Sequence, residues 1–175
     1  KNVKVVLVGQ DPYINYNEAM GLCFSVPKST KCPQSLKNMY KALEKDSKVD
    51  FKQPNPVHGD LESWADQGVL MLNVVLTVKA GQSYSHAKTS GWGKFTTEVI
   101  NAINKHKEGV IFLCWGNKAQ QICKNVNTAK HHVLKYGHPS PLAQKFQKFE
   151  NCTHFSEVND ILKSQDKEPI DWNLK

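Results

Sequence analysis

Four short apolar runs, separated by segments with helical spacing, constrain the fold of this 175-residue chain more than any other feature. The runs cover residues 3–8, 69–78, 109–116 and 131–137. Strands that are apolar on both faces and alternate with helices are typical of parallel sheets with a helical layer on each side. The sequence therefore predicts an α/β fold, a three-layer α/β/α arrangement around a central, mostly parallel four-stranded sheet.

The segments between and after these strands carry apolar residues three and four positions apart, which predicts helices. They are expected over residues 35–46, 61–68, 94–107, 117–126 and 155–164. Ser35 and Ser156 are the expected N-caps of the first and last of them. In the third, Phe95 and Ile100 are expected on the buried face. No repeat, low-complexity tract or linker divides the sequence, so residues 1–175 are predicted to form a single domain.

A strand that begins within three residues of Lys1 suggests that the full-length protein has further N-terminal residues. The sequence shows no signal peptide and no apolar run near the ~18 residues that cross a membrane. The five cysteines are odd in number and lack CxxC spacing, which favours reduced thiols over disulfides or structural zinc. The seven histidines form no HxxxH pair, so no metal is expected. Together these features indicate an intracellular protein.

The formal net charge of +7 favours an anionic partner such as nucleic acid, although charge alone leaves a passive basic surface equally open. All 23 basic residues are lysines. Contacts with phosphate must therefore come from lysines, hydroxyls and main-chain N–H groups. Bidentate readout of guanine by arginine is excluded, so base-sequence specificity by that route is not expected.

Polar side chains follow the predicted strands at the point where each strand ends. Because ligands of such sheets bind outside the carboxyl ends of the strands, we expect these side chains to converge. The four strands contribute, in chain order, Gln10, Asp11 and Tyr13; Asn73; Trp115 and Asn117; and His138, Ser140 and Leu142. One carboxylate and one imidazole without a metal suit hydrolysis or proton transfer, and neither a GxSxG elbow nor a glycine-rich phosphate loop is present.

Asn73 is predicted to lie in the middle of the apolar run 69–78. An unpaired amide there would cost a few kcal/mol, so it must pair with the backbone or bind a ligand. Its adjacent donor and acceptor match the edge of a nucleobase, which keeps both possibilities open.

Several motifs, in this order, resemble those of the uracil-DNA glycosylases. They are GQDPY, GLCFSVP, HGDLESWADQGVLMLNVVLTV, FLCWGNKAQ, GHPSPL and PIDWN, and they extend over nearly the whole chain. The resemblance implies a monofunctional DNA-repair hydrolase that flips deoxyuridine out of DNA and cleaves its N-glycosidic bond. Uracil would be released and an abasic site left. The resemblance further implies no cofactor, a monomer, single- or double-stranded substrate, and a nuclear or mitochondrial location, or a cytoplasmic one if the source is bacterial or viral.

The resemblance also implies roles for the residues of these motifs. Asp11 would orient or deprotonate the attacking water and stabilise the oxocarbenium-like sugar. His138 would donate a hydrogen bond to uracil O2. Without the other motifs, the structural interpretations would be favoured: a turn residue before Pro12 for Asp11, and a satisfied loop histidine for His138.

Uracil itself would be held by four further residues, one of which, Gln10, would act through its backbone or its side-chain amide. Asn73 would read O4 and N3–H, a pair that cytosine reverses. Tyr13 would block the methyl group of thymine, Phe24 would stack on the base, and Gln10 would contact it nearby. Core packing is the structural alternative for Phe24.

DNA would be held mainly by the HPSPL segment. Leu142 would be the wedge that fills the gap left by the flipped nucleotide, its alternative being a side chain tucked under the loop. The expected phosphate contacts are Ser35, Asn117, Pro139 and Ser140, with electrostatic support from Lys145, Lys148 and His86.

Two residues depart from the family pattern. Ile14 follows Tyr13 where the family usually has His, and Asn117 replaces a Ser. The first change alters the hydrogen bonding of the loop that would activate water. A glycosylase-like DNA-binding subunit or adaptor, with weak or no catalysis, is therefore the alternative. A hydrolase of free nucleosides is a third possibility, and it would have no use for Leu142.

Overall fold

The chain folds around one parallel sheet. A computed structural model describes residues 2–175 and gives four strands, β1 (Val5–Gly9), β2 (Val69–Asn73), β3 (Ile111–Trp115) and β4 (His132–Tyr136). Their order across the sheet is β2-β1-β3-β4, and every neighbouring pair is parallel. In register, Gly9 lies opposite Asn73, and Trp115 lies opposite Tyr136. The carboxyl ends of the four strands therefore meet at one edge, which makes a single site there possible.

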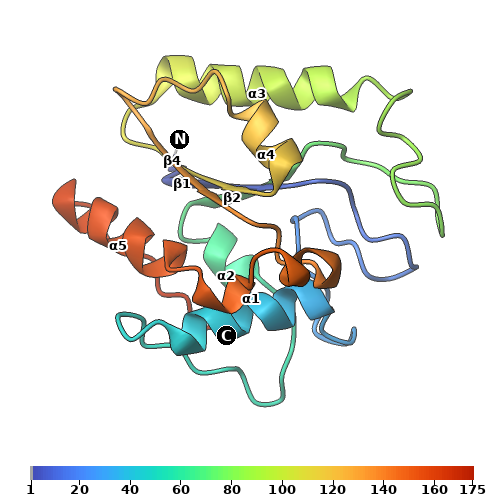
Figure 1. The fold of residues 1–175 in the computed structure, drawn as a ribbon, viewed down its shortest axis with the longest axis horizontal. Helices are drawn as coiled ribbons and strands as arrows, with labels where there is room; N and C mark the ends of the chain where they lie inside the picture. The colour runs from blue at the N-terminus through green and yellow to red at the C-terminus, as the bar shows by residue number, and fades with distance from the viewer. Residues whose placement is uncertain (1) are drawn as a thin grey trace.

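Helices cover both faces of the sheet, as Figure 1 shows. One layer holds α1 (Gln34–Lys45), α2 (Glu62–Ala65) and α5 (His154–Ser164), and the other holds α3 (Trp92–His106) and α4 (Asn117–Ile122). Two short 3-10 helices, η1 (Pro141–Lys145) and η2 (Phe149–Asn151), follow β4. The predicted three-layer α/β/α fold is confirmed.

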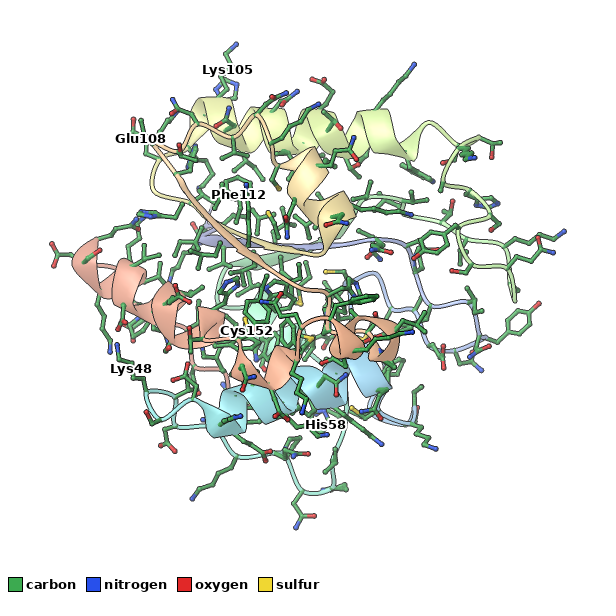
Figure 2. All side chains as sticks on the ribbon, in the orientation of Figure 1. Lys48, His58, Lys105, Glu108, Phe112 and Cys152 are labelled. Carbon is green, nitrogen blue, oxygen red and sulfur yellow. The ribbon has the colours of Figure 1, made fainter. Side chains whose placement is uncertain are left out.

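Alternation along the strands produces two cores, because successive side chains point to opposite faces. On β1, Leu7 faces the α1 side and Val8 the α3 side. Figure 2 shows Phe112 between the sheet and the α3–α4 layer, and Cys152 in the opposite layer. Within residues 2–175, the five cysteines are free and buried, and no helix is long and apolar enough to cross a membrane.

The predicted strand over residues 69–78 is too long. β2 ends at Asn73, so Asn73 terminates the strand and does not lie in its middle. The neighbouring strand β1 also ends, at Gly9, and Pro12 soon afterwards has no N–H to offer a ladder. After Asn73, the backbone N–H of Val75 still donates to the carbonyl of Gln10 at 2.9 Å, so the segments that follow β1 and β2 leave the sheet side by side.

Both predicted serine caps are wrong. α1 begins at Gln34 after Pro33, whose φ of −63° already suits the start of a helix, so Ser35 lies in the first turn. α5 begins at His154 after Thr153, which places Ser156 inside the helix. The Ser156 hydroxyl has another partner, because it donates to the buried Asp46 carboxylate at 2.5 Å.

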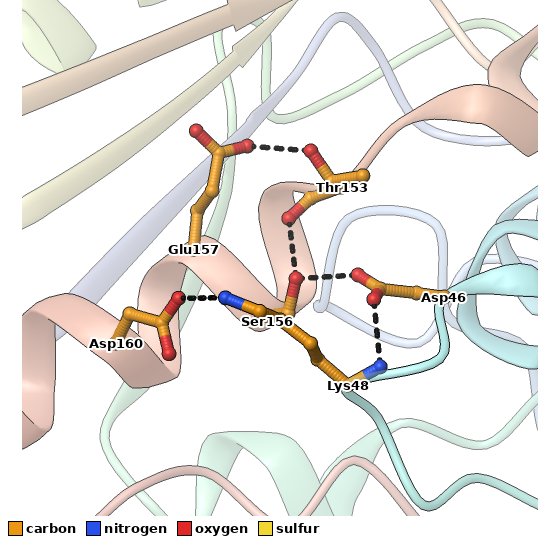
Figure 3. A network of polar contacts seen from close by, with 6 residues as sticks. All are labelled: Asp46, Lys48, Thr153, Ser156, Glu157 and Asp160. Carbon is orange, nitrogen blue, oxygen red and sulfur yellow. Dashed lines mark hydrogen bonds and ion pairs between the residues drawn. The ribbon is translucent and has the colours of Figure 1, made fainter.

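This contact belongs to a polar network that joins the end of α1 to the start of α5 (Figure 3). The other Asp46 oxygen accepts the main-chain N–H of Lys48 at 3.1 Å, and the Lys48 ammonium pairs with Asp160 at 3.0 Å. Beside them, the Thr153 hydroxyl donates to Glu157 at 3.0 Å. Both oxygens of the buried Asp46 carboxylate therefore have donors.

Phe95 is 51% exposed, so its predicted place on the buried face of α3 is wrong. The buried face is formed by Thr96 and Ile100. The Thr96 hydroxyl donates to the Val74 carbonyl at 2.8 Å. Thr96 therefore faces the sheet, and Phe95 faces away from it. The Phe95 ring then lies edge-on to Trp92, with ring centres 5.6 Å apart.

Candidate active site

A cleft of about 790 Å³ opens at the carboxyl edge of the sheet. It is lined by residues of β2, by residues beyond the carboxyl ends of β1, β2 and β4, and by Ser35 in the first turn of α1. The predicted site residues among its lining are Gln10, Asp11, Tyr13, Phe24, Ser35, Asn73 and His138. The structure thus brings the carboxylate, the amide and the imidazole to one cavity although 127 positions separate Asp11 from His138 in the sequence.

Asp11 lies two residues beyond the carboxyl end of β1, where the chain leaves the sheet. Its Oδ2 accepts the main-chain N–H of Tyr84 at 2.9 Å. Within residues 2–175, Oδ1 accepts no hydrogen bond. One oxygen of this cleft-lining residue is therefore held by the protein, while the other has no donor in the described chain, the arrangement that a base or an electrostatic stabiliser needs.

Asn73 lies across Gly9 in the register of β1 and β2. A Cβ at Gly9 would overlap the Asn73 Oδ1, so only glycine there leaves room for the amide. No hydrogen bond joins the Asn73 side chain to any other residue of the described chain, 2–175. The alternative that this amide pairs with the backbone is therefore wrong, and the cleft presents a free donor and a free acceptor.

Phe24 and Tyr13 form an aromatic wall of the cleft. Phe24 has a φ of +66°, and its ring centre lies 6.0 Å from that of Trp115 and 5.8 Å from that of His138. The Tyr13 hydroxyl donates to the Phe24 carbonyl at 2.7 Å. Burial raises the pKa of Tyr13, which keeps this donor protonated. Phe24 therefore packs on the core and lines the cleft at once, so the two interpretations of its role are compatible.

His138 is neutral at ordinary pH, because burial lowers its pKa to about 4. Its Nδ1 accepts the main-chain N–H of Ser140 at 3.0 Å. A neutral imidazole whose Nδ1 accepts must carry its proton on Nε2, which leaves Nε2–H as its donor. The ring lies close to Gly116 at the end of β3, where an added Cβ would be 3.2 Å from the His138 Cβ.

The remaining predicted residues lie outside the cleft. Asn117 is the exposed first residue of α4. Pro139 and Ser140 directly follow His138, and the Pro139 carbonyl accepts the Asn38 side-chain amide at 2.8 Å. Leu142 lies on η1 and is 77% exposed, so the alternative of a side chain tucked under the loop is wrong. Lys145 and Lys148 are exposed in the same segment.

Sequence reasoning missed two residues that hold these loops. Asn38 on α1 reaches the HPSPL segment across 101 positions of sequence. Tyr84, in the polar loop after β2, donates to both Gln10 and Asp11. A signal for Asn38 existed, since a polar residue on the apolar face of a predicted helix needs a partner. Nothing in the sequence marked Tyr84.

Comparison with known proteins assigns the family. The family model described as the uracil DNA glycosylase superfamily matches residues 1–163. The chain belongs to this superfamily. A protein of Vibrio parahaemolyticus named uracil-DNA glycosylase is 54% identical over 173 residues, which are 99% of this chain and 74% of the relative. A uracil-DNA glycosylase of Yersinia pestis is 51% identical over the same shares.

The fold agrees with this assignment. The crystal structure of mimivirus uracil-DNA glycosylase superposes on this chain with a TM-score of 0.92 at 34% identity, covering 99% of this chain and 68% of that one. The resemblance to the uracil-DNA glycosylases is thus confirmed at the level of the family, and the α/β architecture is that of a superfamily member.

Proposed function

We propose that the chain is a monofunctional uracil-DNA glycosylase that removes uracil from DNA in base excision repair. One observation carries this proposal: Asp11, Asn73 and His138 line the same cleft. An everted nucleotide presents a base edge, a glycosidic bond and a sugar within a few ångströms of each other, and these three side chains supply a partner for each.

Recognition of uracil would depend on the free amide of Asn73. Its N–H would donate to O4, and its carbonyl would accept from N3–H. Cytosine presents the opposite pattern and would leave two polar groups mismatched in a confined site. The Phe24 ring would stack on the base, and the Tyr13 ring would occupy the space that the methyl group of thymine requires.

Cleavage would be a hydrolysis assisted by two residues. As the C1′–N1 bond breaks, its electron pair moves onto the uracil ring, where charge develops at O2. The Nε2–H of neutral His138 would stabilise that charge. Asp11 would stabilise the cationic sugar and accept a proton from the water that adds to C1′. The products are free uracil and an abasic site.

DNA would be held around the mouth of the cleft. Leu142, exposed on η1, is the proposed wedge that replaces the flipped nucleotide in the stack. Ser35, Asn117, Pro139 and Ser140 are the proposed phosphate contacts, and the net charge of +7 supports binding of a polyanion. We propose single- and double-stranded DNA as substrates, and a monomer as the active form.

Residues 1–175 are proposed to act as one catalytic domain. The chain spans 74% of the length of the relatives from Vibrio and Yersinia. Those relatives are bacterial, which favours the cytoplasm over a nuclear or mitochondrial location. The buried free thiols are compatible with a reducing compartment.

Release of uracil from a labelled oligonucleotide tests the proposal. Wild-type protein should release uracil, and Asp11→Asn should lower the rate by roughly 10²- to 10⁴-fold, the range for loss of a general base. The DNA affinity of the variant should stay near that of wild type. If wild type releases no more uracil than Asp11→Asn while both bind DNA, the adaptor alternative is correct.

A further inference from the structure

The loop over residues 79–91, here called the Tyr84 loop, is hydrogen-bonded to the segment that carries Asp11. The main-chain N–H of Gly81 donates to the Ile14 carbonyl at 2.8 Å. The main-chain N–H of Tyr84 donates to Asp11 Oδ2 at 2.9 Å, and its hydroxyl donates to Gln10 Oε1 at 2.5 Å. One tyrosine thus contacts two successive residues of the GQDPY motif.

The backbone of Tyr84 is left-handed, with a φ of +59°. Residues with a Cβ adopt this conformation rarely and only when their surroundings impose it, and such residues cluster at functional sites. Here the side chain supplies the restraint. Its hydroxyl is bonded to Gln10, and the Lys118 ammonium lies 3.8 Å from its ring centre, a cation–π contact. Burial, and then the nearby Asp11 charge, raise the pKa of Tyr84 and keep its hydroxyl a donor.

The ends of the loop are fastened without Tyr84. The Lys79 N–H donates to the Ser85 hydroxyl at 2.7 Å, and the Thr77 hydroxyl bonds His86 Nδ1 at 2.9 Å. The Trp92 indole N–H also donates to Thr77, at 2.8 Å. These contacts keep the loop attached to the rest of the fold, so removal of the Tyr84 side chain should loosen the backbone at position 84 without detaching the loop.

We infer that Tyr84 is a positioning residue for the catalytic carboxylate, an inference that rests on the proposed role of Asp11. Gln10 and Lys118 fix the Tyr84 side chain, the side chain fixes the left-handed backbone, and that backbone aims its N–H at Asp11 Oδ2. The carboxylate is thereby held with Oδ1 facing the reacting sugar and water. Such preorganisation acts on the chemical step more than on binding.

The hydrogen bonds of the Tyr84 loop also bear on position 14, where this chain has Ile14 and the family usually has His. The position carries no imidazole to orient the catalytic loop, but its carbonyl accepts Gly81 N–H irrespective of the side chain. The Tyr84 loop therefore holds Asp11 by main-chain hydrogen bonds that do not depend on the side chain at position 14. Retained activity despite Ile14 is expected for this reason.

Single-turnover uracil release, with DNA affinity measured separately, tests the inference in four variants. Tyr84→Phe loses only the bond to Gln10, and the rate should fall roughly threefold to tenfold, as expected for one hydrogen bond. Tyr84→Gly permits the left-handed backbone but removes both anchors, so a fall of roughly 10- to 100-fold is expected. Lys118→Met should cost about twofold to fivefold. Tyr136→Phe, which loses a hydroxyl bond to the Lys148 carbonyl, is the control and should match wild type.

The Kd for the oligonucleotide should change less than about twofold in all four variants, since positioning acts on the chemical step. In an Asp11→Asn background, Tyr84→Gly should cause no further loss, because the residue that it positions has already been disabled. Rates within twofold of wild type for both Tyr84 variants, or an undiminished loss in the Asp11→Asn background, would overturn the inference. A wild-type rate no higher than that of Asp11→Asn would instead refute the proposed function.

Discussion

Two asparagines, Asn73 and Asn159, have opposite hydrogen-bonding states. On α5, the Asn159 amide donates to the Ile170 carbonyl at 2.9 Å and accepts the Ile170 N–H at 2.8 Å, so it fastens the C-terminal segment. At the end of β2, the Asn73 amide bonds to nothing within residues 2–175 and lines the cleft. Polar side chains that serve the fold are satisfied by the fold. A partly buried amide without a partner, on a concave wall, indicates a ligand.

The carboxylates divide in the same way. Asp46 has donors on both oxygens in the network between α1 and α5, whereas Asp11 has a donor on one oxygen only. Strained backbone is concentrated there too, since Asn17, Phe24 and Tyr84 line the cleft and have positive φ, whereas Asp166, the fourth non-glycine residue of this kind within residues 2–175, lies after α5. The cleft is thus the region where the sequence departs from what folding alone would favour.

Replacing Asn73 should produce the largest effect among the tests of this contrast. Asn73→Ala should lower kcat/KM for uracil release by roughly 10²- to 10³-fold, because the base loses both bonds that identify it. Its free energy of unfolding should stay near that of wild type. Asn159→Ala is the matched control and should show the reverse, full activity with a loss of stability. Equal effects of the two substitutions on activity would refute the distinction.

Removing the exposed side chain of Leu142 should have a smaller effect that depends on the substrate. Leu142→Ala should reduce kcat/KM on duplex DNA by roughly 10- to 100-fold, because nothing then fills the gap in the stack. On single-stranded DNA the loss should be under about threefold. Val57→Ala, at a position also exposed but on the loop before α2, should change neither. Unchanged activity of Leu142→Ala on duplex would favour the nucleoside hydrolase.

Ser156→Ala should reduce stability without touching activity. It leaves one oxygen of the buried Asp46 carboxylate without a donor, which should cost about 1–3 kcal/mol of unfolding free energy in urea titrations. Ser164→Ala, which loses a bond from an exposed hydroxyl to the Ile161 carbonyl, should cost less than about 0.5 kcal/mol. A drop in uracil release for Ser156→Ala in the fully folded protein would contradict the separation of the two regions.

The smallest expected effect concerns the His138 ring, which should stay neutral over the pH range in which a free histidine titrates. Because the pKa of His138 is about 4, its ring resonances should not shift between pH 8 and pH 5. Assignment by His138→Asn identifies them. In the unfolded chain the His138 pKa is ~6.5, so the unfolded state binds the proton more readily than the folded state does. The contribution of His138 to stability is therefore fully present above pH ~6.5 and decreases as the pH falls toward 4. A midpoint near ~6.5 in the folded protein would show that the imidazole is not buried neutral.

Sequence periodicity predicted the four strands and the three layers, because burial on both faces leaves a clear record in apolar runs. It gave the strand length and both helix caps wrongly. Asn73 ends its strand because the neighbouring strand stops too, and Ser156 donates to Asp46, which follows the end of the distant helix α1. Such outcomes depend on partners far along the chain, which local spacing does not reveal.

Motifs predicted most of the cleft, because Asp11, Asn73 and His138 each lie at or just beyond the carboxyl end of a strand, and these ends meet at one edge of the sheet. Tyr84 was beyond reach of this reasoning. A tyrosine in the sequence does not predict a left-handed backbone. The partners of Tyr84 are Gln10, which follows β1, and Lys118, which follows β3, so they are far apart in the sequence. The tautomer of His138 likewise depends on a main-chain donor that only the fold positions.

The most direct test of the account is a crystal structure of Asp11→Asn bound to a duplex that contains one deoxyuridine. The uracil should be everted into the cleft, with its O4 and N3 against the Asn73 amide, its O2 at the Nε2 of His138, and Leu142 in the vacated stack. A bound duplex with the deoxyuridine still paired, or a uracil that contacts neither Asn73 nor His138, would contradict it.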